Sequence, residues 1–380
     1  MDKNKCLDIF FALLTSQLTG GNKVSLDGIT EEEIGYIFSL AKAHELLPIV
    51  LSAVSHSDSR FAKSSAVKNG IYKAIGIHER KLAAKDTIVG ILEAEKIDYI
   101  LLKGSAISSL YPVYWWRTFG DIDILIKRED VLRATDALKR KSDFLITVSG
   151  YKDIQILYCS NEKIELHLSL SGINGNKASC VLDRVWDYSV RKNKDVSEHV
   201  LNDEMLFFYH LSHMASHLQN GGCGIRFFCD YYLLLKNKDC DFNKLNEMLR
   251  QAGLEKFADC VLRICNMWFE GKNDDGVKET AEYIISTGNF GTRKTFLGTK
   301  CSQKGTFRYV LSRIFISHAE LCELYPSLKE KKYKAPVFRI KYLGSVFFDR
   351  NRFARAAKDY LKINKNDKNK IKRILDTVGL

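Results

Sequence analysis

Apolar residues recur every three or four positions along most of the chain, and this spacing predicts amphipathic helices. One of these helices has a defined start, because Thr30 and Glu33 form a capping box directly before an apolar run. The helical pattern covers residues 2–97 and 180–187 and continues from 203, with further helices at 242–249, 254–269, 277–285 and 307–324. Residues 271–275 and 287–304 are predicted to be loops.

A different pattern occupies residues 98–170, where short apolar runs of strand length replace the helical period. A small mixed sheet between helical blocks is an α+β organisation. Four regions are therefore predicted: an N-terminal helical region (1–96), a sheet core (97–171), a helical domain (172–325) and a C-terminal helical segment (326–380).

Two acidic residues lie within the second predicted strand of this core. Asp121 and Asp123 are separated by one residue, so a strand would point both carboxylates to the same face. The residues Ile122, Ile124 and Ile126 would fill the opposite, buried face. Paired carboxylates repel each other unless a cation neutralises them, so this pattern predicts a divalent metal site.

The preceding segment has the features of a phosphate-binding turn. Residues 98–102 read as a buried strand that leads directly into Gly104 and Ser105, and a short helix is predicted at 106–110. A small-residue turn at the start of a helix exposes backbone N–H groups to an anion. The Gly104-Ser105 pair alone would indicate only a turn, and its combination with the acidic strand favours the functional interpretation.

A third acid follows on a predicted hairpin formed by residues 153–159 and 163–168. Glu165 and His167 share one face of the second strand, and apolar residues fill the other. We expect Glu165 to complete the metal site, since a second metal ion that activates an attacking hydroxyl needs a further carboxylate. His167 is expected either to contact the substrate or a metal ligand, or to be a half-buried histidine without a catalytic role.

Four segments together resemble a bacterial family of uncharacterised nucleotidyltransferases within the polymerase-beta-like superfamily: residues 102–105, 110–112, Arg117 and residues 120–123. The same resemblance covers Glu165 to His167. It implies that the sheet core is a polymerase-beta-like nucleotidyltransferase core. It also implies transfer of a nucleoside monophosphate from a nucleoside triphosphate to an acceptor hydroxyl, with release of pyrophosphate; the acceptor is a small molecule, a protein or an RNA.

The resemblance also implies roles for individual residues. The catalytic residues and metal ligands are expected to be Asp121, Asp123 and Glu165, which would hold two Mg²⁺ ions or alternatively Mn²⁺. Four residues are expected to bind the nucleotide phosphates: Lys103, Gly104, Ser105 and Arg117. For Lys103 a structural ion pair is an alternative, because it lies close to the end of the strand.

Three histidines lie on one face of a later predicted helix, at positions 210, 213 and 217, and Asp230 follows on the next helix. Histidines at this spacing beside an acid can bind zinc or iron. We favour packed imidazoles that are hydrogen-bonded to a carboxylate, or a role in a substrate pocket.

The charge of the chain is concentrated near its C-terminus. The net charge is +12, and residues 329–373 contain sixteen Lys and Arg against four Asp and Glu, so this segment accounts for all of it. Such a segment can bind an anionic partner, namely RNA, an anionic membrane surface or an acidic protein. Tyr342, Leu343 and Phe347 lie among the basic residues, so part of the segment is expected to pack as an amphipathic helix. An alternative function is a basic nucleic-acid-binding or antitoxin-like module on an inactive nucleotidyltransferase fold.

The ten cysteines include no Cys-x-x-Cys pair, which favours buried thiols in a reducing compartment over structural zinc. No apolar run reaches the length of about 18 residues that crosses a bilayer. A cytoplasmic enzyme is therefore expected.

Overall fold

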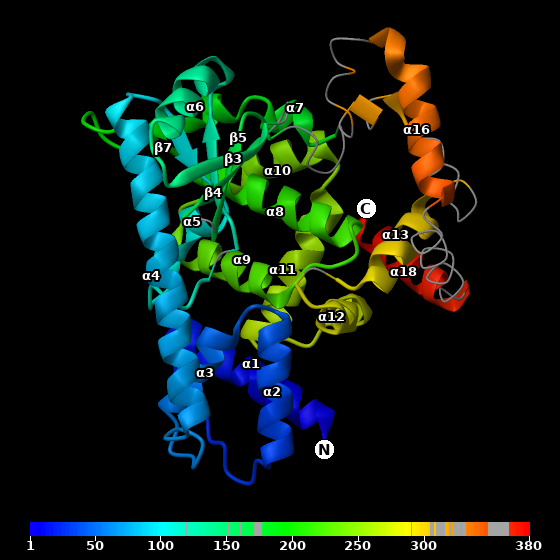
Figure 1. The fold of residues 1–380 in the computed structure, drawn as a ribbon. Coiled ribbons are helices and arrows are strands. Elements are labelled where there is room, and N and C mark those ends of the chain that lie inside the picture. Colours follow the sequence, from blue (N-terminus) through cyan, green and yellow to red (C-terminus); the bar gives the residue numbers. More distant parts are fainter. Residues whose placement is uncertain are drawn as a thin grey trace.

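The N-terminal helices are present, as the sequence predicts. The computed structural model describes residues 1–118, 120–149, 153–159, 161–170, 177–289, 291–304, 332–348 and 365–380, together with isolated residues between 308 and 328. The four helices are α1 (Lys3–Thr19), α2 (Glu31–Ala43), α3 (Leu47–Ser55) and α4 (Ser65–Ala94). The predicted capping box is confirmed: Glu33 N donates to Thr30 Oγ1, and Thr30 N donates to Glu33 Oε2. The long helix α4 runs from the N-terminal helices up to the sheet (Figure 1).

Seven strands form one mixed sheet in the order β3-β4-β5-β2-β1-β7-β6. The strands are β1 (Tyr99–Leu101), β2 (Ile122–Ile126), β3 (Phe144–Ser149), β4 (Asp153–Tyr158), β5 (Glu162–His167), β6 (Ser189–Arg191) and β7 (Glu198–Leu201). Strand β2 is antiparallel to β1 and parallel to β5. The prediction of an α+β fold with a small mixed sheet is confirmed.

The two faces of the sheet pack against different helices. The isoleucines of β2 at 122, 124 and 126 lie with apolar residues of α4 and α6 (Val131–Lys139) in one buried cluster. Ile100 and Leu125 point to the other face, where they join the main hydrophobic core with α8 (Asp203–Gln219) and α9 (Ile225–Asn237). Because side chains alternate along β2, Asp123 also points toward α8 and α9 rather than toward α4.

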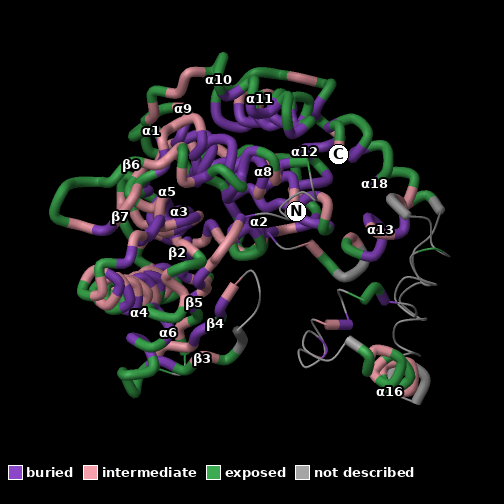
Figure 2. Tube along the Cα trace, turned by 90° about the horizontal axis from the view of Figure 1, so that it is seen from above, coloured by how far each residue is buried: buried purple, intermediate pink, exposed green. Residues whose placement is uncertain are grey.

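Further helices build the helical part of the protein around α8 and α9 (Figure 1). Short elements precede them: α5 (Gly104–Ile107), η1 (Ser108–Leu110), η2 (Arg128–Asp130), α7 (Ser179–Leu182) and η3 (Val185–Tyr188). The later helices are α10 (Phe242–Ala252), α11 (Glu255–Phe269), α12 (Asp275–Thr287), α13 (Arg293–Lys304), η5 (Lys332–Lys334), α16 (Ala335–Phe348) and α18 (Lys365–Val378). Seen from above, buried residues concentrate where α8, α9 and α11 meet (Figure 2).

Two local predictions were wrong. Strands β6 and β7 extend the sheet beyond residue 170, where no strand was predicted. Residues 293–304 form α13 instead of part of a loop, because Leu297 and Cys301 are buried and the helix packs against α18. The predicted helix at 307–324 lies mostly outside the described residues.

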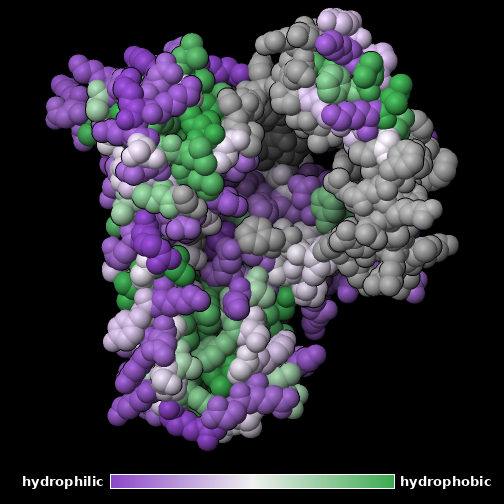
Figure 3. Space-filling model, viewed as in Figure 1, coloured by the Kyte–Doolittle hydropathy of each residue, from purple (hydrophilic) through white to green (hydrophobic). Residues whose placement is uncertain are grey.

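The described parts of the basic C-terminal segment form helices. In α18 the apolar residues Ile371, Ile374, Leu375 and Val378 join the main core, and the basic residues lie on the outside. In α16 Phe338 and Tyr342 pack on a small separate cluster around Leu321. In α16 Tyr342 thus packs against apolar residues as expected, and α18 shows amphipathic packing as well. The α16 surface carries both hydrophobic and hydrophilic residues in the space-filling view (Figure 3).

Among the described residues, none of the helices combines the length and the apolar character needed to span a membrane. A cytoplasmic location stays a prediction.

Candidate active site

Two neighbouring strands bring two acids together on the α8 side of the sheet. Strands β2 and β5 are parallel, and their register pairs Asp123 with Glu165. His167 lies two residues beyond Glu165 and on the same face. The ligand atoms of Asp123, Glu165 and His167 lie within 4.8 Å of one another, and theirs is the one such group found among the described residues.

A hydrogen bond from His167 orients Asp123. The Nε2 atom of His167 lies 2.8 Å from Asp123 Oδ1, which accepts, and 3.7 Å from Glu165 Oε2. Lys103 Nζ donates to the same Oδ1 atom at 2.6 Å. Burial alone would raise the pKa of Asp123, but the His167 hydrogen bond and the Lys103 charge outweigh it and hold that pKa below its ordinary value.

Glu165 has the opposite shift. Burial, and next the charge of Asp123, raise the pKa of Glu165, and the charge of Asp121 acts in the same direction. The two acids are thus close enough to repel each other. A divalent cation between them would remove this repulsion, and carboxylate oxygens are the ligands that Mg²⁺ and Mn²⁺ prefer. The donor set therefore fits the predicted metal.

Asp121 is placed differently from the prediction. It directly precedes β2 instead of belonging to the strand, and it is not part of the group formed by Asp123, Glu165 and His167. It stays within electrostatic reach of Glu165.

The predicted turn between a strand and a short helix forms after β1. Gly104 and Ser105 are the first two residues of α5, and Gly104 is buried. The Oγ atom of Ser105 is buried, and among the described residues it has no hydrogen-bond partner. A buried hydroxyl without a partner is costly. Ser105 thus has an unused donor and acceptor at the predicted position.

A cavity of about 620 Å³ lies beside α5, bounded by α4 and by β7. Ser105, Ser108 and Tyr114 line it from one side, and His78 and Lys85 from α4. This volume is in the range of small-molecule sites.

Arg117 makes a different contact from the predicted one. Its guanidinium group is buried and donates to both carboxylate oxygens of Asp230 on α9, with both distances 2.7 Å. The Tyr111 hydroxyl donates to the same carboxylate, also at 2.7 Å. This cluster connects the segment after α5 with the helical part. The predicted contact between Arg117 and a triphosphate stays a prediction.

The histidines of α8 do not form a metal site with Asp230 among the described residues. His210 Nε2 lies 2.9 Å from the carbonyl oxygen of Phe227, which accepts. His213 Nε2 and His217 Nε2 lie 3.2 Å apart. Burial lowers the pKa of His217 to about 4, and the charge of Lys103 acts in the same direction. These described contacts are to a carbonyl and to another imidazole, whereas a hydrogen bond to a carboxylate was expected.

Tyr209 is a further residue near the acids that was not predicted from the sequence, and it lies one helical turn before His213 on α8. Burial raises the pKa of its hydroxyl, and the charges of Asp123 and Glu165 add to this effect, so the Tyr209 hydroxyl lies within electrostatic reach of the two acids. Its four-residue spacing from His213 was the available signal.

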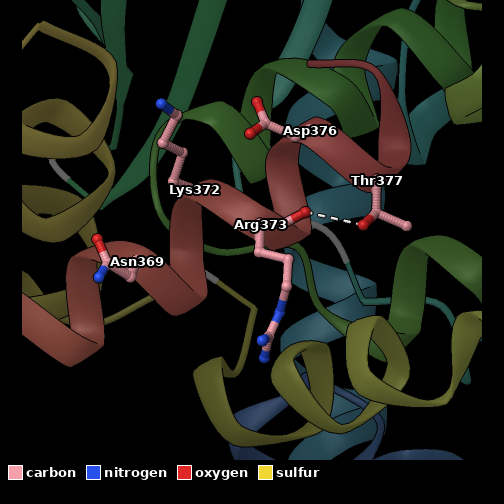
Figure 4. A pocket seen from close by; sticks show the side chains of 5 residues that line it. All are labelled: Asn369, Lys372, Arg373, Asp376 and Thr377. Carbon is pink, nitrogen blue, oxygen red and sulfur yellow. Dashed lines mark hydrogen bonds between the residues drawn. The ribbon is translucent and has the colours of Figure 1, made fainter.

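A depression on α18 lies apart from these residues (Figure 4). Asn369, Lys372, Arg373, Asp376 and Thr377 line it, all from one helix. Thr377 Oγ1 donates to the backbone carbonyl of Arg373, and the Arg373 side chain pairs with Glu279 on α12. These residues provide no group of metal-binding side chains, so the acid cluster is the candidate active site.

A mixed sheet with acids on two adjacent strands, and a glycine-serine turn before them, is the arrangement that the resemblance to nucleotidyltransferases implies. The chain belongs to the family described as "Uncharacterised nucleotidyltransferase", whose family model matches residues 30–270. The matched region includes every candidate site residue and both α8 and α9. Comparisons with curated proteins and with solved structures found no match.

Proposed function

We propose that this protein transfers a nucleoside monophosphate from a nucleoside triphosphate to the hydroxyl group of an acceptor, with release of pyrophosphate. The observation that carries the proposal is the pair of carboxylates, Asp123 and Glu165, held side by side on β2 and β5. Family membership supports nucleotidyl transfer in general and a nucleoside triphosphate as substrate.

Asp123 and Glu165 would hold the Mg²⁺ ions, with Asp121 as a further ligand before β2. When bound, the metal ions would neutralise the triphosphate and stabilise the entering and leaving oxygens. His167 would orient the Asp123 carboxylate through its hydrogen bond. Lys103 and the turn at Gly104 and Ser105 would contact the phosphates. Arg117, through its ion pair with Asp230, would connect the segment after α5 with the helical part.

In the proposed reaction the acceptor oxygen attacks the α-phosphorus. A new oxygen–phosphorus bond forms, and the bond between the α-phosphorus and the oxygen that bridges to the β-phosphorus breaks. Pyrophosphate leaves with that bridging oxygen. The proton of the acceptor hydroxyl would pass to Glu165, the carboxylate proposed on the acceptor side of the site.

Labelled triphosphates test this reaction. The purified protein, Mg²⁺ and a cell extract are incubated with nucleoside triphosphates that carry the label at the α- or at the γ-phosphorus. We expect the α-label to enter an acceptor and the γ-label to appear in pyrophosphate. Transfer of the γ-label to the acceptor would instead indicate a kinase and would refute the proposal.

Glu165→Gln separates binding from chemistry. Glutamine keeps the shape but lacks the negative charge, so affinity for a metal-bound triphosphate is expected to change by less than about tenfold, whereas transfer falls by about a thousandfold. Calorimetry with a non-hydrolysable triphosphate analogue measures the first quantity, and the label assay measures the second. Equal losses in both would show that Glu165 acts only in nucleotide binding.

A further inference from the structure

Lys103 contacts the carboxylate group of Asp123, a proposed metal ligand. Its ammonium group lies 2.6 Å from Asp123 Oδ1, and His167 Nε2 lies 2.8 Å from the same atom. One oxygen of the Asp123 carboxylate thus already accepts from two donors, one of them a full positive charge. The Asp123 side chain is only 6 % exposed and that of Lys103 is 27 % exposed, so the ammonium covers the buried carboxylate on its solvent side.

The backbone of Lys103 supports a specific role for this side chain. Lys103 has φ +49° and ψ −126°, a conformation that favours glycine and that other residues rarely adopt. A side chain held in such a conformation must be fixed by its surroundings, and these residues cluster at functional sites. The strained position directs the Lys103 side chain from the end of β1 to β2.

A divalent cation on the Asp123 carboxylate and the Lys103 ammonium group oppose each other, because both are positive and both contact the same buried carboxylate. A bound triphosphate changes this competition, since it provides new negative oxygens for the ammonium group. With nucleotide bound, the Lys103 ammonium group can exchange Asp123 for a phosphate oxygen. Without nucleotide, a metal ion that displaces Lys103 from Asp123 offers the ammonium group no phosphate in return.

We propose that Lys103 acts as a built-in cation that keeps the metal site closed until a nucleoside triphosphate arrives. This inference rests on the proposed function. It predicts that the protein binds a divalent metal ion weakly on its own and much more tightly together with a triphosphate. Lys103 is the residue that couples the two binding events.

Manganese binding measures this coupling directly. Electron paramagnetic resonance of free Mn²⁺ gives the affinity of the intact protein with and without a non-hydrolysable triphosphate analogue. For Lys103→Met we expect Mn²⁺ alone to bind at least about tenfold more tightly than to the wild type, because its competitor is gone. The analogue, in contrast, should bind about tenfold more weakly, since it loses one charge-assisted hydrogen bond. The coupling factor between Mn²⁺ and the analogue should therefore fall strongly.

Lys127→Met is the matched control. Lys127 also pairs with an aspartate of the same sheet, Asp98, at 3.0 Å, but at the opposite end of β1 and β2. This variant should have the wild-type affinities. Lys103→Gln provides a second neutral variant, and thermal unfolding of each variant shows that it is folded.

The outcomes distinguish this inference from the proposed function. If the Lys103 variants bind Mn²⁺ no more tightly than the wild type and keep its coupling factor, Lys103 is a structural ion pair and the inference is wrong. If the wild type binds no Mn²⁺ even with the triphosphate analogue, the proposed function fails and the inference fails with it.

Discussion

Two buried aspartates, Asp123 and Asp230, show how one residue type serves different purposes in this protein. Both have a cationic partner, and both have a pKa below the ordinary value although burial opposes this. Asp230 is matched by one guanidinium group, and both of its carboxylate oxygens accept hydrogen bonds from Arg117. Asp123 receives both of its hydrogen bonds from described residues on a single oxygen, Oδ1.

The difference lies in the surrounding charge. Around Asp230 the positive and negative charges balance, and a buried balanced pair fixes the position of two segments. Around Asp123 a second carboxylate, Glu165, adds negative charge that Lys103 alone does not cancel. A further cation would stabilise a partly buried site that has excess negative charge. The comparison supports the proposal that Asp123 binds a metal ion, and it indicates a structural role for Asp230.

The largest expected effect is that of Asp123→Asn on transfer. The amide has a similar shape but cannot neutralise a metal ion, so transfer of the α-label should fall by about a thousandfold or more, equivalent to about 4 kcal/mol of transition-state stabilisation. The melting temperature without metal should change little. Asp98→Asn, at the other end of the sheet, is the control and should keep full activity. Near-wild-type transfer by Asp123→Asn would contradict the assignment.

Asp230→Leu should instead affect stability. It leaves the Arg117 guanidinium group buried without its partner, which should cost about 3–5 kcal/mol in the free energy of unfolding. Urea denaturation measures this cost. The double variant Arg117→Met with Asp230→Leu should recover most of it, because no unpaired charge remains. A cost below about 1 kcal/mol for Asp230→Leu would show that the ion pair does not hold the two segments together.

A smaller, pH-dependent effect on stability is expected at His44, a buried histidine whose two ring nitrogens both form hydrogen bonds. His44 Nδ1 accepts a hydrogen bond from Ile225 N, and Nε2 donates to the carbonyl oxygen of Ile285, with both distances 3.1 Å. Burial lowers the pKa of His44 from 6.5 to about 4. Below pH 6.5 the unfolded chain therefore takes up a proton that the folded chain does not. Stability should fall as the pH drops from about 6.5 to about 4, by up to roughly 3 kcal/mol.

His44→Gln tests this effect, because the amide can form both hydrogen bonds but does not titrate. Subtracting the pH profile of the variant from that of the wild type isolates the His44 contribution. Parallel profiles between pH 4 and 7 would mean that His44 does not titrate as expected.

The sequence predicted those parts of the fold that depend on local patterns. The capping box at Thr30, the strand around Asp123 and the face shared by Glu165 and His167 all follow from spacing along the chain. Strand alternation also showed that Asp123 and the β2 isoleucines lie on opposite faces.

Contacts between distant segments could not be predicted in this way. Arg117 and Asp230 are 113 positions apart, and nothing near Arg117 in the sequence indicates its partner. The short strands β6 and β7 depend on pairing with β1, and α13 depends on packing against α18. In each case tertiary contacts, rather than the local pattern, determine the structure.

Crystals of the protein soaked with Mn²⁺ and a non-hydrolysable triphosphate analogue would test the central claim most directly. Anomalous scattering at the manganese edge locates the ion independently of the protein structure. We predict manganese bound by Asp123 and Glu165, at metal–oxygen distances of about 2.1 Å, with the analogue phosphates beside it. Manganese bound at the α8 histidines, or none at Asp123 and Glu165, would contradict the account.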